Sequence, residues 1–118
     1  MSKLSEQELH NLAMNTVGKK LEEDSFEFLA VNSKLKKDPQ FVALKNKKLH
    51  FIIVRAVRYP DNPEKFDESF MDTIKEHANK FNAKTYYAGV GIANSSNYDL
   101  PVDHQNDYLI NYQGLQEI

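Results

Sequence analysis

Apolar and polar residues alternate through the middle of the chain in a pattern that predicts β-strands. We expect a short strand at Phe41–Lys45, a two-residue turn at Asn46–Lys47 and a long strand at Lys48–Tyr59. The run Phe51–Val54 is apolar on both faces of this strand. The long strand is therefore predicted to lie at the centre of a sheet that is covered on both sides.

Two segments show the three-to-four spacing of apolar residues that is typical of amphipathic helices. The first begins at Ser5, which is placed to form a capping box with Glu8. The second begins at about Pro63 or Asp67 and ends at Phe81. Both helices are predicted to pack an apolar stripe against the sheet.

Three further strands are predicted at Phe26–Leu35, Thr85–Ala93 and Asp107–Tyr112. Gly89 and Gly91 share one face of the second of these, which usually means that another backbone passes close by. The resulting order, αβββαββ, predicts an α+β fold with a single mixed sheet, a meander of three strands and a second helix that crosses back over it. Restriction-endonuclease-like folds have the same element order, which is an analogy of architecture.

Composition narrows the class of protein. A chain of 118 residues with 41% hydrophobic and 27% charged residues is typical of one globular domain, spanning residues 1–118. Without cysteine there is no disulfide, thiolate-bound cluster or thiolate zinc site. The longest apolar run, Phe51–Val54, is far shorter than the roughly 20 residues of a membrane span. We therefore expect a cytoplasmic protein with no membrane insertion, no cofactor and no metal.

Positive charge is concentrated in one segment of the chain. Eight of the 15 basic residues lie between Lys34 and Arg58 against the single acid Asp38, so this segment carries +7 within a net charge of −2. Such asymmetry can mark a nucleic-acid surface. Lysines also keep the edges of sheets soluble, and we favour this second interpretation. The candidate residues for nucleic-acid binding are Lys34, Lys36, Lys37, Lys45, Lys47 and Lys48.

The element order suggests a nuclease, but the residues do not support one. Nucleases of this architecture resemble one another in needing carboxylates on the second and third strands to hold Mg²⁺. The matching segments, Phe41–Lys45 and Lys48–Tyr59, contain no acid. We expect no nuclease activity from this pattern.

Arg55 is the most informative single residue, because it follows Phe51 and Ile53 on one strand face and should be partly covered. A covered arginine needs a carboxylate or carbonyl partner. The candidates for anion or ligand binding are Arg55, His50 and Tyr86, in one pocket. The alternative that we favour is structural, with Arg55 paired to Glu27 or to a helix acid or extending toward solvent.

The remaining patterns are weak. The four histidines are scattered and no His-Glu-x-x-His motif is present, and Gly89-Val90-Gly91 lacks the following helix of a dinucleotide-binding motif. The six tyrosines suit a sheet, a dimer interface or the stacking of bases equally well.

Four stretches resemble a known family over nearly the full length: SEQELHNLAMN, EFLAVNSKLKKDPQFVALKNKKLHFIIVRAVRYP, KFNAKTYYAGVGIAN and INYQGLQEI. The chain is similar to short bacterial proteins that often carry the label of the redox component of the Na(+)-translocating NADH-quinone reductase. The genuine redox component has a membrane anchor, a cysteine-ligated 2Fe–2S domain and flavin- and NADH-binding domains, and no position here matches them. The resemblance therefore implies an accessory role and no electron-transfer residue.

Together these patterns predict a small α+β protein with a non-catalytic binding or accessory role, forming a homodimer with an unknown protein partner. One alternative is a catalytically inactive, nuclease-like domain that binds nucleic acid. A second alternative is a small-molecule enzyme with a pocket near Arg55.

Overall fold

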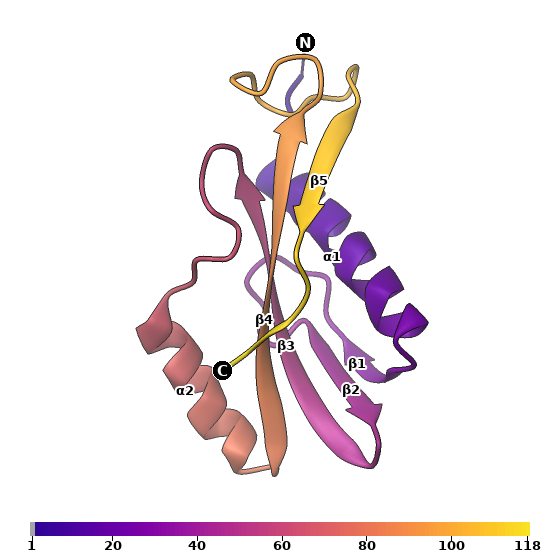
Figure 1. Cartoon of the computed structure of the whole chain (residues 1–118), viewed down its shortest axis with the longest axis vertical. Coiled ribbons are helices and arrows are strands. Elements are labelled where there is room, and N and C mark those ends of the chain that lie inside the picture. The colour runs from indigo at the N-terminus through magenta and orange to yellow at the C-terminus, as the bar shows by residue number, and fades with distance from the viewer. Residues whose placement is uncertain (1) are drawn as a thin grey trace.

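The computed structural model describes residues 2–118, which form a mixed sheet with one helix on each face (Figure 1). Its elements are α1 (Glu6–Glu23), β1 (Glu27–Val31), β2 (Phe41–Lys45), β3 (Lys48–Arg58), α2 (Glu68–Asn79), β4 (Ala83–Asn94), β5 (Tyr108–Tyr112) and β6 (Gln116–Glu117). The α+β class, the single mixed sheet and the predicted order of elements are confirmed. The short strand β6 is an addition to the predicted order.

The strands lie in the order β1-β2-β3-β4-β5, and β6 pairs with β4 beyond the end of β5. Strands β1, β2 and β3 form the predicted antiparallel meander, whereas β3 and β4 run parallel because α2 connects them. Asn46 and Lys47 have φ angles of 53° and 62°, as a two-residue hairpin turn of this type requires. The turn pairs Leu44 with Leu49 and so fixes which side chains share a face.

The first strand is shorter than predicted. It ends at Val31, and the prediction that it continues to Leu35 is wrong. The Oδ1 atom of Asn32 accepts a hydrogen bond from the backbone N–H of Lys34 at 3.1 Å, which favours a local turn over a continued strand. Residues 32–40 therefore form a loop beside β3.

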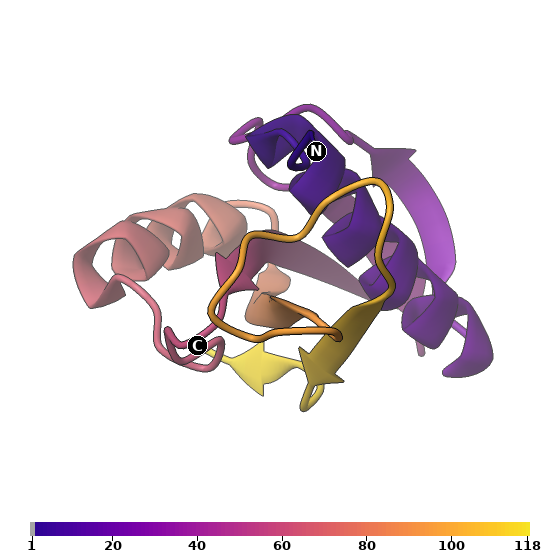
Figure 2. The ribbon, with the colours of Figure 1, turned by 90° about the horizontal axis from the view of Figure 1, so that it is seen from above.

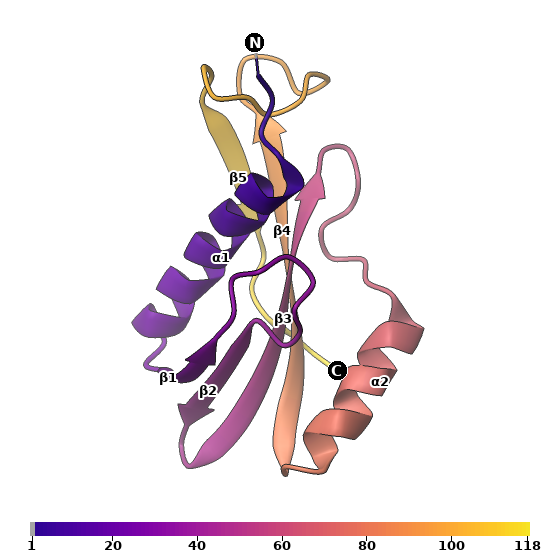
Figure 3. The same ribbon diagram turned by 180° about the vertical axis from the view of Figure 1, so that it is seen from behind.

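Helix α1 covers one face of the sheet (Figure 3, where it lies in front of β4 and β5). Its capping box is formed as predicted, with Ser5 and Glu8 each accepting the other's backbone N–H. The core beneath it joins Leu21 and Val17 of the helix to Ile52 and Val54 of β3. These side chains are almost completely buried, so α1 and the central strands form the main apolar core.

Helix α2 packs on the opposite face, where Met71 contacts Ile53 and Tyr87. Figure 2 shows the two helices on either side of the central strand pair, and in Figure 1 the upper ends of the strands extend beyond α2. The helix begins after Asp67, whose carboxylate accepts the N–H of Phe70, within the range that the sequence predicts. This arrangement leaves the upper part of the second face to loops.

The loop of residues 59–67 crosses β4 at its glycine-lined face. A Cβ atom placed on Gly89 would overlap the carbonyl oxygen of Pro63, and one on Gly91 would lie 3.1 Å from the Cγ atom of Pro63. The prediction that another backbone passes close to these glycines is confirmed. Gly89 thus determines how closely this loop approaches the sheet.

The N-terminal segment lies beside the loop of residues 95–107 (Figure 1). The N–H of Leu4 donates to the carbonyl of Val102 at 2.9 Å. His104 contributes two further contacts, from Nε2 to Oε2 of Glu8 at 2.7 Å and from Nδ1 to the carbonyl oxygen of Ser2 at 3.0 Å. The hydrogen bond to Glu8 raises the pKa of His104, while hydrogen bonds from the Ser5 backbone and from His104 lower the pKa of Glu8.

These shifts predict that the contact between the N-terminus and this loop depends on pH. The raised pKa of His104 gives stability that is complete below the unfolded value and lost as the pH rises through the folded value. The lowered pKa of Glu8 gives stability that is complete above its unfolded value and lost in acid. Amide exchange protection of Leu4, after correction for intrinsic rates, should be highest between about pH 4.3 and 6.5 and fall above that range.

The matched variant is His104→Gln, which retains hydrogen-bonding groups but does not gain a proton. Its protection at Leu4 should not change above about pH 6.5, where a histidine loses its charge. Identical pH profiles for the two proteins would show that the pair of His104 and Glu8 does not hold the loop.

Candidate ligand-binding site

The candidate site lies at the edge of β3, just beyond the end of β2. The pairing of the two strands ends at Phe41 and Ile52, and the completely buried side chain of Gln40 then takes over. Its Oε1 atom accepts the backbone N–H of Val54 at 2.7 Å, and its Nε2 atom donates to Oδ1 of Asp38 at 2.7 Å. One amide side chain therefore replaces a strand contact and positions the carboxylate beside Arg55.

Arg55 is held by Asp38 through two hydrogen bonds, of 2.8 Å from Nη1 and 3.1 Å from Nη2. Nη1 also donates to the carbonyl of Val54 at 3.0 Å, and the guanidinium lies 5.3 Å from the ring centre of Phe70. Burial acts to raise the pKa of Asp38, but hydrogen bonds from Arg55 and Gln40 outweigh it and lower the pKa. Asp38 is therefore ionised at neutral pH and forms a bidentate ion pair.

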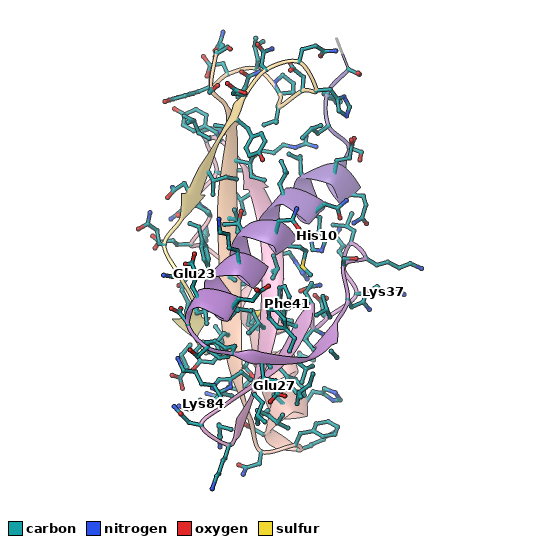
Figure 4. All side chains as sticks on the ribbon, turned by 90° about the vertical axis from the view of Figure 1, so that its right-hand side faces the viewer. His10, Glu23, Glu27, Lys37, Phe41 and Lys84 are labelled. Atoms are coloured by element: carbon teal, nitrogen blue, oxygen red, sulfur yellow. The ribbon has the colours of Figure 1, made fainter. Side chains whose placement is uncertain are left out.

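The identity of this partner differs from the prediction. Arg55 pairs with Asp38, not with Glu27 or with an acid of either helix. Glu27 lies at the start of β1, well below the level of His10 in Figure 4. The carboxylate that reaches Arg55 comes from the loop of residues 32–40, which the sequence pattern assigned in part to a strand.

His10 is the feature of the site that sequence reasoning missed. It is 1% exposed on the inner side of α1, and neither ring nitrogen has a hydrogen-bond partner among residues 2–118. Burial lowers the pKa of His10, the charge of Arg55 lowers it further, and Asp38 acts in the opposite direction. The ring is therefore neutral at pH 7, with one nitrogen as a donor and one as an acceptor.

An unpaired buried polar group costs about 1–3 kcal/mol, so this histidine calls for an explanation. Its place in the apolar stripe of α1, between Leu9 and Ala13, was the available signal in the sequence. Figure 4 shows His10 on the side of α1 nearest the loop that carries Lys37, whose own side chain extends away from the protein. The imidazole thus lies between the helix and this loop.

A hollow of about 160 Å³ opens beside His10. Its lining includes the apolar Leu9 and Leu35, the paired Arg55, and two exposed cations, Lys36 and Arg58. Neither of those two cations has an ion-pair partner among residues 2–118. One acid, Glu6, also contributes to the rim, so positive charge is in excess. We call this hollow the Arg55 pocket.

The other two predicted ligand residues lie elsewhere, and the prediction of one pocket containing Arg55, His50 and Tyr86 is wrong. His50 and Tyr86 stack on each other with ring centres 5.6 Å apart. His50 is opposite Lys84 in the sheet whereas Arg55 is opposite Gly89, five residues further along. Since neighbouring strand residues also point to opposite faces, His50 and Arg55 lie on different sides of the sheet.

The basic segment does not form one surface. Lys34, Lys36 and Lys37 precede β2, whereas Lys45, Lys47 and Lys48 follow it at the hairpin turn. The five residues of β2 separate the two groups by roughly 17 Å. Two of the hairpin lysines have local contacts, since Lys45 lies 4.9 Å from the ring centre of Phe26 and Lys48 donates to Asn82 at 3.3 Å. The geometry therefore gives nucleic-acid binding less support than the sequence did.

Among residues 2–118, no group of three or more His, Cys, Asp or Glu side chains could hold a metal ion. Over the same residues, no helix has the length and apolar character needed to cross a membrane.

The fold and the Arg55 pocket define a small α+β domain with a polar hollow at a sheet edge. The chain belongs to the family described as "Domain of unknown function (DUF8840)", whose model matches residues 7–118. No curated protein and no solved structure matches this chain.

Proposed function

We propose that this protein is a non-catalytic binding module that takes a small anion in the Arg55 pocket. The observation that carries the proposal is the buried His10, whose two ring nitrogens have no partner among residues 2–118 and which lines a hollow with Lys36 and Arg58. A carboxylate or a phosphate could accept hydrogen bonds from His10 and from the free guanidinium of Arg58. Arg55 is largely neutralised by Asp38, so its role is to shape the pocket.

Binding rather than catalysis is favoured by the state of the acid in this site. Both oxygens of Asp38 accept hydrogen bonds from Arg55, one of them also from Gln40, and the pKa of Asp38 is lowered. A carboxylate in that state is a weak base and is held away from a ligand. The second alternative, a small-molecule enzyme at Arg55, therefore has less support than a binding role.

The wider role that we propose is that of a cytoplasmic, homodimeric accessory protein, as the resemblance to short proteins with the NADH-quinone reductase label implies. The edge strand β5 supports a dimer, because it carries no charged residue and exposes Tyr108, Leu109 and Ile110. Uncharged apolar edges are the kind that pair with another chain. Sedimentation at several concentrations tests the dimer, and affinity capture tests the accessory role.

The anion site predicts saturable binding of inorganic phosphate, followed by amide chemical shifts in a titration of ¹⁵N-labelled protein at constant ionic strength. Shifts should concentrate at residues 10, 36, 55 and 58. The double variant Lys36→Ala/Arg58→Ala should weaken binding about tenfold or more, because it removes both free cations. Lys47→Ala at the hairpin turn, distant from the pocket, is the control for lost positive charge and should bind as the wild type does.

Two outcomes would overturn this proposal. One is the absence of saturable shifts around His10 with either phosphate or acetate at millimolar concentration. The other is an equal loss of affinity in Lys47→Ala, which would mean that the anion senses only overall charge.

A further inference from the structure

A second hollow adjoins the Arg55 pocket and shares one residue with it. It measures about 170 Å³, and Arg58 lines both spaces. The rest of its wall is mainly apolar or aromatic, from Tyr59, Tyr98, Ile92, Leu100, Pro101 and Val102. We call this space the tyrosine pocket. The side chain of Arg58 thus stands between a polar hollow on one side and an apolar hollow on the other.

We infer that the ligand of this protein is an anion carried on a planar apolar ring, such as an aryl phosphate or an aryl carboxylate. This inference rests on the anion site proposed above and adds the class of molecule. The charged group would lie with Lys36 and Arg58, next to His10, and the ring would lie in the tyrosine pocket. Arg58 would then contact the ligand where its two parts join.

The size of the tyrosine pocket suits a single ring. An apolar cavity of about 150 Å³ in another protein is known to hold benzene, and the tyrosine pocket is slightly larger at about 170 Å³. The same space opens past Tyr59 and Tyr98 toward a further apolar hollow of about 310 Å³. Substituents on the ring therefore have room in that direction.

The two tyrosines provide flat surfaces for stacking. The rings of Tyr59 and Tyr98 lie 5.3 Å apart between centres at an interplanar angle of 58°, in contact with each other. Their exposed fractions are 50% and 48%, which is unusually high for aromatic residues that line an apolar space. A planar ring that covers them would remove this apolar surface from water and gain edge-to-face or stacked contacts.

Charge fixes the direction in which such a ligand binds. The acids near the apolar hollows are Asp99 and Asp61, both on the far side of Tyr59 and Tyr98 from the Arg55 pocket. The free cations Lys36 and Arg58 lie on the near side. An anionic group at the ring end would meet like charge, whereas an anionic group beside Arg58 meets opposite charge.

The test compares inorganic phosphate, phenyl phosphate and phenol by isothermal titration calorimetry on the wild type and three variants. Phenyl phosphate should bind about tenfold tighter than inorganic phosphate, because stacking adds to the anion contacts. Tyr98→Ala should remove this advantage and leave phosphate binding unchanged, whereas Arg58→Ala should weaken both. Tyr108→Ala, at an exposed tyrosine outside these hollows, is the matched control and should bind as the wild type does.

The failures of this inference and of the anion site are separate results. Equal affinities for phosphate and phenyl phosphate, with no effect of Tyr98→Ala, would overturn the aryl ligand and leave the anion site intact. Phenol bound as tightly as phenyl phosphate would also overturn it, since the ring would then bind without Arg58. No binding of either phosphate would mean that the anion site itself is wrong. Circular dichroism melting of each variant confirms that it is folded.

Discussion

Replacing Gly89 with alanine should destabilise the protein by about 3 kcal/mol, the upper end of the usual cost of overpacking. The added methyl group would overlap the carbonyl oxygen of Pro63 and lie 2.8 Å from the Cε2 atom of Tyr87. The obstacle is the backbone of the loop of residues 59–67, which cannot rotate away as a side chain can. Relief requires the loop to lift from β4, with loss of packing around Pro63, which is itself buried.

Urea unfolding measures this loss, and two other glycines provide graded controls. Gly91→Ala places its methyl 3.1 Å from the side chain of Pro63, so it should cost less than Gly89→Ala. Gly18→Ala lies inside α1 with the ring of Phe41 at 3.3 Å, where alanine gains about 1 kcal/mol of helix propensity. Its net effect should be close to zero. An unfolding midpoint of Gly89→Ala equal to that of the wild type would show that the loop yields freely.

Gly89 also links the fold to the proposed ligand. Tyr59 begins the loop that crosses the glycine-lined face, and its N–H donates to the carbonyl of Ile92 at 3.2 Å. A loop lifted from β4 would therefore carry Tyr59 away from Tyr98. Gly89→Ala is expected to weaken phenyl phosphate more than inorganic phosphate, because only the former uses the tyrosine pocket.

The parts of the fold that could be predicted are those set by local pattern. The turn at Asn46–Lys47 fixes the hairpin, the apolar run Phe51–Val54 places β3 at the centre, and the glycines of β4 indicate a backbone crossing. Each of these rests on residues close in sequence. The α+β class follows from their order.

The candidate site was harder to predict, because its parts come from distant segments and from exceptions to the patterns. Asp38 lies 17 residues from Arg55 in the chain, and a buried amide, Gln40, holds it there in place of a strand contact. No periodicity reports an amide that substitutes for a ladder. His10 was visible only as a polar residue within an apolar stripe, which is far more often a satisfied core histidine than part of a site.

The ion pair of Asp38 and Arg55 gives the second large effect. Asp38→Asn preserves the shape of the side chain but leaves the guanidinium without its counter-ion. Breaking a fully buried pair costs about 3–5 kcal/mol. Arg55 is 25% exposed and Asp38 14% exposed, so solvent screening reduces the expected loss to about 2 kcal/mol. Urea unfolding at pH 7 measures it, and Asp61→Asn, at an exposed acid with no ion pair within residues 2–118, is the control.

The pH dependence of the same variant identifies the cause. Because the pKa of Asp38 is lowered in the folded state, its contribution is complete above the unfolded value of about 3.9 and is lost as the pH falls through the folded value. The stability difference between wild type and Asp38→Asn should therefore shrink in acid. A difference that stays constant down to about pH 2 would assign the loss to packing or to the hydrogen bond with Gln40 instead of to charge.

The pair also controls the charge of His10, which connects stability to binding. Asp38 raises the pKa of His10 while Arg55 lowers it, so removal of the carboxylate charge leaves the lowering effect unopposed. The pKa of His10 should fall further in Asp38→Asn, and NMR titration of the imidazole measures that change. Phosphate binding at pH 7 should persist or strengthen, since His10 is neutral in both proteins and Arg55 becomes free to hold the anion. Weaker binding would show that Asp38 organises the pocket chiefly by holding the loop of residues 32–40 in place.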